Sequence, residues 1–241
     1  MPSNTNRVLN VTSGANHTIV LGETRGDDGN HGTEIWGSGD GSTGQLGPEY
    51  LQLIRDGAPS TIFRPINLPL QQFGLAGYQI KRVTASWETT YVVLSCEGKG
   101  DVVISMGADD FGDLGIGGKA KGKGKEKEGP VHIVSFAHLT VDGNPLRNAT
   151  IAVQAIAAGQ HHVVAQLSVT GKDWDTRTCI VGWGASRHGQ LGSYPLPTPL
   201  ILLSLLHLAI NTPSFCAPPA ESPALDRIGK DSCKESKAHD G

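Results

Sequence analysis

The sequence predicts an all-β chain of many short strands, and two features of its composition carry this prediction. Glycine supplies 32 of the 241 residues, about 13%, against roughly 7% in average proteins. That much glycine without a collagen period indicates many tight turns. Helix-forming residues seldom occur in runs, and there are only 2 methionines. An all-β chain is therefore favoured over the α/β folds that many enzymes use.

Charge and apolar content narrow the class of protein. The 20 Lys and Arg residues against 23 Asp and Glu leave a formal charge of −3, which excludes a histone-like or polybasic binder. Hydrophobic residues make up 38%, enough for one sizeable core. Residues Met1–Asn10 lack the layout of a secretory signal, and the apolar run Leu200–Ile210 is too short to cross a bilayer. We therefore expect a cytoplasmic or nuclear protein with free thiols and no membrane contact.

A threefold internal repeat organises the chain. Segments Val8–Leu21, Ile80–Leu94 and Val153–Gln166 resemble one another at spacings of 72 and 73 residues. Self-similarity at a fixed period indicates a repeat architecture. The aligned positions are Val11 with Val83 and Ile156, Gly14 with Ser86 and Gly159, and His17 with Thr89 and His162.

A second element follows each segment: a Trp-Gly-type pair and then a turn of the Gly-Gln-Leu-Gly type. We place six, four and four residues between the glycine of the pair and the first glycine of the turn. The first turn glycine permits a positive φ, and the leucine can return to the core. The positions with expected structural roles are Gly14, His17, Trp36, Gly37, Gly44, Leu46, Gly47, Gly107, Gly112, Leu114, Gly115, Gly159, His162, Trp183, Gly184, Gly189, Leu191 and Gly192.

Each unit is predicted to contain four short strands. Buried strands are expected at Thr18–Leu21, Thr90–Leu94 and Val163–Leu167, with hairpin partners at Ile35–Trp36, Val102–Met106 and Cys179–Trp183. Pro65 and Pro130 mark weakly extended stretches that suit outer edge strands, where a missing amide donor is tolerated. Trp36 and Trp183 should pack in the core, whereas Trp87 and Trp174 should lie in loops or at strand edges. Four short strands a unit predict a partial β-propeller of about three blades.

The order Val-x-x-Gly-x-x-His-Thr, Trp-Gly and Gly-Gln-Leu-Gly resembles the repeat of the regulator of chromosome condensation family. The clearest stretches are Ser13–Leu21 with Trp36–Gly47, and Gly159–Val164 with Trp183–Gly192. The middle unit departs from the pattern but keeps its positions. The resemblance covers about residues 7–192 and implies the seven-bladed β-propeller of that family.

Three units should not close a ring, since propellers use about 4 to 8 blades. The composition also changes abruptly at Ser193, after which only Gly229 and Gly241 continue the glycine-rich character. We therefore expect a partial propeller over residues 1–192 and a degenerate or disordered, non-repeat tail over residues 193–241. The hypothesis is an incomplete or altered version of a longer repeat protein.

No motif for catalysis, phosphate binding or metal binding stands out, so we expect no enzyme and no cofactor. His161–His162 suggest a metal, but His162 repeats the position of His17 and is better explained as structural. The lysine-rich loop Lys119–Lys127 could contact nucleic acid, although its glutamates and lack of aromatics favour a solvated loop.

The predicted function is protein binding through loops on one rim of the propeller. The loops Ser38–Thr43, Ala108–Phe111 and Ala185–His188 occupy equivalent positions and should cluster there. Arginine and aromatic side chains concentrate binding energy at interfaces. The candidate contacts are Asp109, Asp110, Phe111, Arg187 and His188.

The resemblance implies three alternative roles. One is that of the alpha-tubulin suppressor-like members, which partner a small zinc protein in diphthamide synthesis and wobble-uridine tRNA modification. Another is guanine-nucleotide exchange on a Ran-type small GTPase with chromatin binding. The first is favoured because the N-terminus carries only Arg7 and no β-wedge for exchange is evident. The third is a regulatory propeller fragment of a multidomain enzyme.

Overall fold

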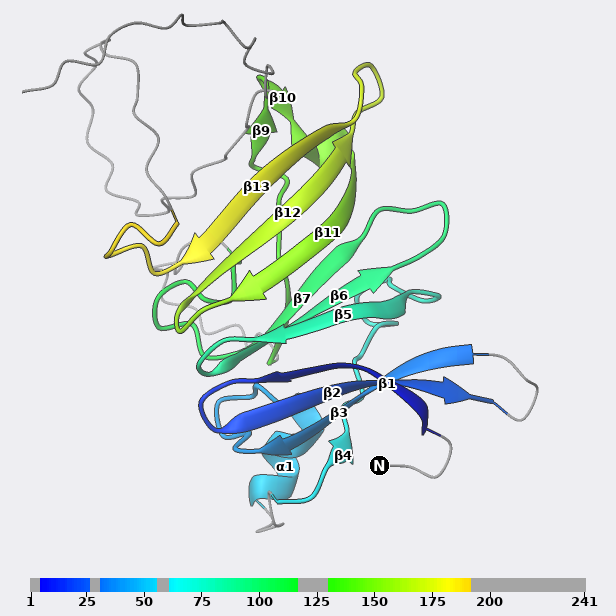
Figure 1. Ribbon diagram of the computed structural model, residues 1–241, viewed down its shortest axis with the longest axis vertical. Coiled ribbons are helices and arrows are strands. Elements are labelled where there is room, and N and C mark those ends of the chain that lie inside the picture. Colours follow the sequence, from blue (N-terminus) through cyan, green and yellow to red (C-terminus); the bar gives the residue numbers. More distant parts are fainter. Residues whose placement is uncertain (1–4, 27–30, 56–60, 117–129, 192–241) are drawn as a thin grey trace, which may run out of the picture.

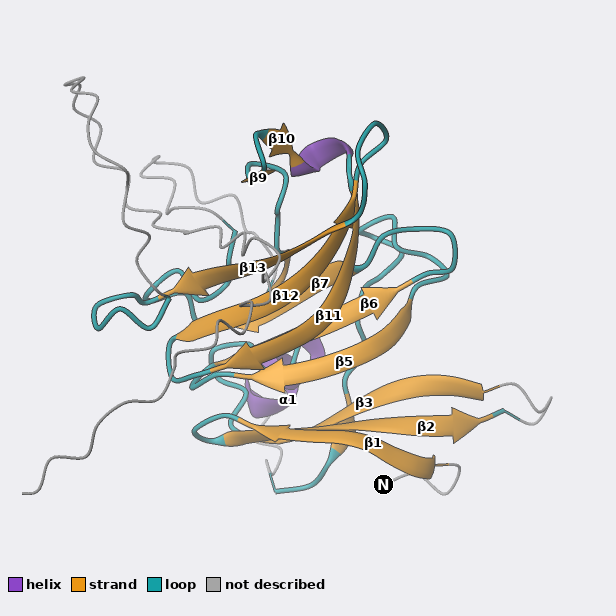
Figure 2. Ribbon diagram, turned by 45° about the horizontal axis from the view of Figure 1, so that its top comes forward, coloured by secondary structure: helices purple, strands orange, loops and turns teal. Residues whose placement is uncertain are grey.

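The computed structural model describes residues 5–26, 31–55, 61–116 and 130–191. They form a mostly β fold of small antiparallel sheets with little helix (Figures 1 and 2). No helix in these ranges is long and apolar enough to span a bilayer. Three of the predicted features lie outside the described residues: Gly192, the lysine-rich loop Lys119–Lys127 and the tail over residues 193–241.

Three sheets, called here the first, middle and last, correspond to the three repeat units. Within each sheet the strands are hydrogen-bonded in chain order. The first sheet comprises β1 (Thr5–Ser13), β2 (His17–Arg25), β3 (His31–Gly39) and β4 (Arg64–Pro65). The middle sheet comprises β5 (Gln79–Ala85), β6 (Thr89–Ser95), β7 (Val102–Gly107) and β8 (Val131–Ile133). The last sheet comprises β11 (Thr150–Ala158), β12 (His162–Thr170) and β13 (Arg177–Gly184).

The predicted buried strands and their hairpin partners are confirmed in all three units, but the last sheet has three strands among the described residues where four were predicted. The buried runs lie within β2, β6 and β12, and their hairpin partners lie within β3, β7 and β13. The two short strands expected next to Pro65 and Pro130 are β4 and β8, and each is the outer edge of its sheet. Trp87 and Trp174 lie in turns, as expected.

The repeat register of the first unit differs from the prediction by two residues. Strand pairing sets Gly39 opposite His17, just as it sets Gly107 opposite Thr89 and Gly184 opposite His162. Gly39 is therefore the true counterpart of Gly107 and Gly184. Gly37, assigned to that role from the sequence, is instead the counterpart of Gly182. The loop of six residues becomes one of four, equal to the other two.

The corrected register also changes the repeat position assigned to Trp36. It pairs with Val20 on β2, a position that Val181 occupies in the last sheet, so it is not the counterpart of Trp183. Trp183 is only 6% exposed and lies in the core, as expected. Trp36 is half-buried, on the face of the first sheet that no other described sheet covers. The sequence alignment equated the two tryptophans because each of them precedes a glycine.

A helix corrects the all-β prediction. Helix α1 (Pro48–Arg55) follows directly on Gly47. Proline is well tolerated in the first turn of a helix, and Glu49 there complements the helix dipole. Tyr50 anchors α1, because its hydroxyl donates to the carbonyl of Gly37. A two-stranded ribbon of β9 (Thr140–Val141) and β10 (Asn144–Pro145), with the 3₁₀ turn Leu146–Asn148, completes the described elements.

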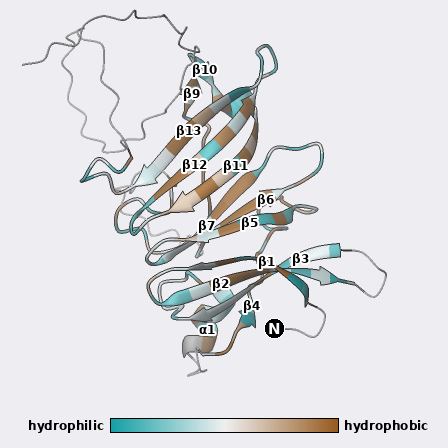
Figure 3. Ribbon diagram, in the orientation of Figure 1, coloured by the Kyte–Doolittle hydropathy of each residue, from teal (hydrophilic) through white to brown (hydrophobic). Residues whose placement is uncertain are grey.

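The three sheets stack face to face, and two apolar layers fill the junctions between them. The junction of the first and middle sheets contains Ile19 and Ile35 on one side and Val92 and Ile104 on the other. The junction of the middle and last sheets contains Tyr91, Val103, Val163 and Trp183 among others. The middle sheet is thus covered on both faces, and Figure 3 shows hydrophobic residues running along its strands β6 and β7.

Contacts between neighbouring sheets recur with the repeat. The backbone N–H of Ala15 donates to the carbonyl of Trp87 at 2.9 Å, and the N–H of Trp87 donates to the carbonyl of Gln160 at 3.0 Å. These three residues occupy the same repeat position, in the turn between the first two strands of each unit. One rule of attachment therefore relates the first sheet to the middle one and the middle sheet to the last.

Thr33 and Asp101, which occupy the same repeat position, form a second polar contact between neighbouring sheets. The Thr33 hydroxyl donates to the carbonyl of Ile80 at 2.9 Å across the first junction. Its counterpart Asp101 accepts from the N–H of Val153 at 2.7 Å across the second junction. Asp101 also pairs with Lys81 at 2.7 Å. The same place in each unit supplies the polar link to the next.

Candidate functional site

Three four-residue loops lie at equivalent positions on one edge of the stacked sheets. They follow β3, β7 and β13 and comprise residues 40–43, 108–111 and 185–188. The glycine before each loop has a positive φ, between +94° and +131°. A Cβ at this glycine would overlap the backbone carbonyl of the turn between the unit's first two strands. The pairs are Gly39 with Asn16, Gly107 with Glu88 and Gly184 with His161.

Each loop is closed by the same pair of contacts. The side chain at the Gln position of the turn accepts a backbone N–H from two residues earlier: Gln45 from Thr43 at 3.0 Å, Asp113 from Phe111 at 3.4 Å, and Gln190 from His188 at 2.9 Å. The leucines that follow, Leu46, Leu114 and Leu191, are buried, as predicted. Rigid, closed loops of this kind suit recognition, because little conformational entropy remains to be lost on binding.

Aromatic and cationic side chains from the middle and last sheets lie together where the rim loops of these two sheets are adjacent. The Phe111 ring lies 4.5 Å from the His161 ring, centroid to centroid, and the Arg187 guanidinium lies 5.0 Å from the Phe111 centroid. Trp87, 45% exposed, lies 6.2 Å from His161. We call Trp87, Phe111, His161 and Arg187 the rim cluster. Its members come from two loops and two turns on two sheets.

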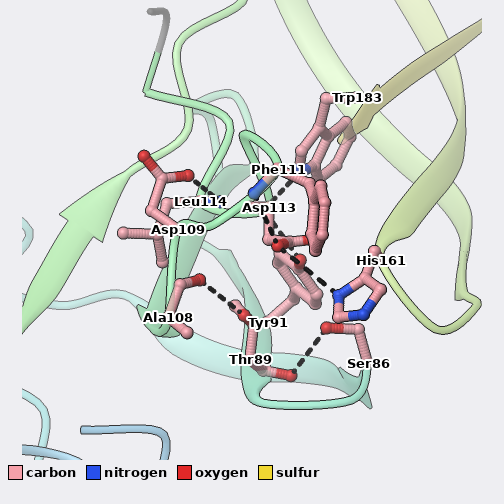
Figure 4. Close-up of polar contacts among 10 residues, drawn as sticks. All are labelled: Ser86, Thr89, Tyr91, Ala108, Asp109, Phe111, Asp113, Leu114, His161 and Trp183. Atoms are coloured by element: carbon pink, nitrogen blue, oxygen red, sulfur yellow. Dashed lines mark hydrogen bonds and ion pairs between the residues drawn. The ribbon is translucent and has the colours of Figure 1, made fainter. Parts of the chain in front are cut away.

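Asp113 fixes the base of the rim cluster (Figure 4). Its carbonyl accepts from the Tyr91 hydroxyl at 2.7 Å and from the Trp183 indole at 3.0 Å. Its carboxylate lies 3.8 Å from Nδ1 of His161. Burial raises the pKa of Asp113 to about 6, and the neighbouring His161 opposes this rise. The acid therefore joins the last sheet to the middle one and holds the imidazole beneath Phe111.

The five sequence-predicted contacts fall into three groups. Phe111 and Arg187 are brought together, with the arginine over the ring. Asp110 and His188 are exposed beside them. Asp109 is occupied within its own loop, where its carboxylate accepts the N–H of Leu114 at 3.0 Å.

Trp87 and His161 were missed as contacts by sequence reasoning. Both lie in the turns between the first two strands of their units, which are the turns next to the rim loops. The available signal was their variability: Ala15, Trp87 and Gln160 stand at one position, and Asn16, Glu88 and His161 at the next. Positions that vary between copies of a repeat are free to serve recognition.

His17 and Gly14 act as a structural pair in the first unit. His17 is 3% exposed, and its Nε2 lies 3.0 Å from the Thr90 hydroxyl of the middle sheet. Burial lowers the pKa of His17 to about 4. A Cβ on Gly14 would overlap this imidazole and the Ser86 carbonyl. The middle unit replaces both members at once, with Ser86 and the smaller Thr89, which explains its departure from the pattern.

The rim cluster offers aromatic, imidazole and guanidinium groups that can contact a partner. Within the described ranges, no three His, Cys, Asp or Glu side chains gather as metal ligands. The Ser86 hydroxyl, near His161, points to the Thr89 carbonyl at 3.5 Å rather than to the imidazole. A scan of family models, a search of curated proteins and a search of solved structures each gave no match for this chain.

Proposed function

We propose that the three sheets are consecutive blades of a β-propeller, of the kind found in the regulator of chromosome condensation family. The recurring attachment supports this arrangement. Ala15, Trp87 and Gln160 repeat one hydrogen bond, and Thr33 and Asp101, at equivalent positions, each form a polar contact with the next sheet. Units joined by the same contact are related by the same rotation, and repetition of one rotation arranges sheets around an axis.

The function that this arrangement supports best is a non-catalytic platform for binding another protein. The observation that carries it is the rim cluster. Arginine stacked on an aromatic ring, with a second aromatic 45% exposed beside it, is the composition of an interface hot spot. Asp110 and Arg187 give the rim both signs of charge, which would orient a partner.

Capture of the partner tests this function. Full-length chain is immobilised, exposed to cell extract, and the bound proteins are identified by mass spectrometry. The variant Phe111→Ala/Arg187→Ala should lose the partner at least tenfold. Ser42→Ala, a change on the equivalent loop of the first sheet, is the matched control and should retain it. Equal capture by both variants would overturn the rim as the binding surface.

The identity of the captured protein selects among the roles implied by the family resemblance. A small zinc protein would favour the diphthamide and wobble-uridine role. A Ran-type GTPase would favour nucleotide exchange, and a catalytic chain would favour a regulatory fragment. Chromatin captured in a salt-sensitive manner would instead direct attention to the lysine-rich loop Lys119–Lys127.

A further inference from the structure

Among the described residues, each outer sheet of the stack has one face that no other sheet covers. On the last sheet this open face carries Val164, Gln166, Thr178, Ile180 and Gly182, and Ile180 is 43% exposed. On the first sheet it carries Val8, Val11, Val20, Glu34 and Trp36, and Val11 is 59% exposed. Large exposed apolar side chains on a flat sheet mark an interaction surface.

The open face of the last sheet has the features of a face that covers the next sheet. Ile180 is the counterpart of Ile35 and Val103, both of which are buried in junctions. Gly182 is the counterpart of Gly37, and a Cβ at either would lie 2.7 to 2.8 Å from the turn leucine, Leu191 or Leu46.

The open face of the first sheet has the features of a face that receives the previous sheet. Val11 is the counterpart of Val83, which is 4% exposed. Val20, itself only 3% exposed, is the counterpart of Val92, which is fully buried between the first and middle sheets. One face of this chain therefore matches the other as the two sides of its own junctions match.

Polar groups are matched as well. Gln166 stands where the first sheet has Leu21, and Glu34 stands where the middle sheet has Val102, one residue further along the paired strands. Thus each open face carries one polar residue at a position where the inner junction is apolar. An amide can donate to a carboxylate there, whereas either alone in an apolar junction would be costly.

Within the described residues, the attachment hydrogen bond is not continued beyond either outer unit. Gln160 accepts from Trp87, but its own N–H donates to none of the described residues. The Ala15 carbonyl, at the equivalent position in the first unit, accepts from none of them. Thr178 repeats the place of Thr33, whose hydroxyl links the first sheet to the middle one.

We infer that two copies of this chain associate head to tail, the open face of each last sheet covering the open face of the other copy's first sheet. Two identical junctions form, and three sheets from each copy make six, within the roughly 4 to 8 sheets that close a propeller. Closure leaves neither face unpaired, as a heterologous contact requires if it is not to continue into a fibre. This inference rests on the proposed arrangement of the sheets around one axis.

Two single variants test the ring by light scattering on the full-length chain. The wild type should have twice the 25.3 kDa mass of the chain. Val11→Asp spoils only the first-sheet face and Ile180→Asp only the last-sheet face, and each should give monomer. Both positions are exposed, so the fold itself should tolerate the change. Ile133→Asp, at a similarly exposed residue on β8, is the matched control and should remain a dimer.

Mixing the two variants gives the decisive result. One intact junction can form between the last sheet of the Val11→Asp chain and the first sheet of the Ile180→Asp chain, so the mixture should recover dimers. Dimers lost in only one variant would indicate like-to-like contact and overturn the inference. Wild-type monomer at every concentration, or a polymer of no fixed length, would also overturn it. A monomer that still captures a partner through Phe111 and Arg187 would overturn the ring and leave the proposed function standing.

Discussion

The middle and last sheets repeat one sequence pattern, yet their strands are buried differently. In β6 the six residues Thr89–Leu94 are all buried. In β12 buried residues alternate with more exposed ones along the strand. Among the described sheets, the middle one has a neighbour on each face and the last one has a neighbour on one face. The environment of a repeated residue therefore depends on the place of its unit in the stack as much as on its place in the repeat.

The comparison predicts that one substitution has different effects in the two sheets. The largest difference is expected for Gly107→Ala against Gly184→Ala. Both glycines have positive φ and lie against a carbonyl, so alanine adds strain and overlap. We expect Gly107→Ala to lose about 4 kcal/mol of unfolding free energy, and Gly184→Ala about half of that, because the open sheet can shift. Urea unfolding followed by circular dichroism measures both, and equal losses would break the comparison.

The next largest difference between the sheets is expected for the truncation of an isoleucine to alanine. Ile104 is fully buried in the first junction, and Ile180 is 43% exposed. Ile104→Ala should lose about 3 kcal/mol, since it removes apolar contacts and leaves a cavity. Ile180→Ala should stay within about 0.5 kcal/mol in the monomeric state. Unfolding is compared at protein concentrations low enough to exclude association. A large loss at Ile180 would mean that its face is covered within the monomer.

The pair Gly14 and Gly159 sharpens the comparison at the outer turns. A Cβ on Gly14 meets both buried His17 and the Ser86 backbone, whereas the three atoms nearest to one on Gly159 all belong to the His162 ring, which can move toward solvent. Gly14→Ala should therefore lose about 2 kcal/mol and Gly159→Ala less than about 1 kcal/mol. Thermal unfolding midpoints rank the two variants. The reverse order would show that the His162 ring is held more firmly than its exposure indicates.

Acidification is expected to have the smallest effect on the unfolding free energy. The contributions of His17 and Asp113, on opposite sides of the middle sheet, have opposite signs. The folded-state pKa of His17 is about 4, below its unfolded value of 6.5, so acidification between these values favours the unfolded chain. The folded-state pKa of Asp113 is about 6, above its unfolded value of 3.8, so the same acidification favours the folded chain. Each contributes about 1–2 kcal/mol between pH 7 and pH 5, and the two nearly cancel.

Single substitutions reveal each acid effect separately. Asp113→Asn keeps an oxygen to accept the Phe111 N–H and removes the carboxyl, so this variant should lose stability on acidification more steeply than the wild type. His17→Thr, which borrows the residue of the middle unit, should gain stability over the same range. Urea unfolding at pH 7 and pH 5 measures both slopes. Parallel slopes in all three proteins would contradict the assigned pKa values.

Much of the fold follows from the sequence because local rules determine it. Alternating and continuous apolar runs predict β2, β6 and β12, and Pro65 and Pro130 predict the edge strands. The register of the first unit could not be read this way, since Trp36–Gly37 imitates Trp183–Gly184 and only strand pairing separates them. Helix α1 depends on a long-range bond from Tyr50 to Gly37, which no local pattern shows.

Two of the four residues of the rim cluster could be predicted from the sequence. Phe111 and Arg187 stand in loops that the repeat makes equivalent, so the sequence predicts that they share an edge. Trp87 and His161 enter the cluster through the turns of their units, and only the stacking of sheets brings those turns beside the loops. Contacts between units are invisible to a pattern that describes one unit at a time.

The glycine that precedes each rim loop has a practical consequence. Any side chain at this glycine would overlap the backbone of the adjacent turn, so the start of the loop depends on the glycine alone. The side chain at the glutamine position then closes the loop by accepting a backbone N–H. The four residues between them thus behave as an exchangeable cassette, whose sequence can be randomised without rewriting the scaffold. Libraries built at residues 40–43 and 185–188 would turn this chain into a source of engineered affinity reagents.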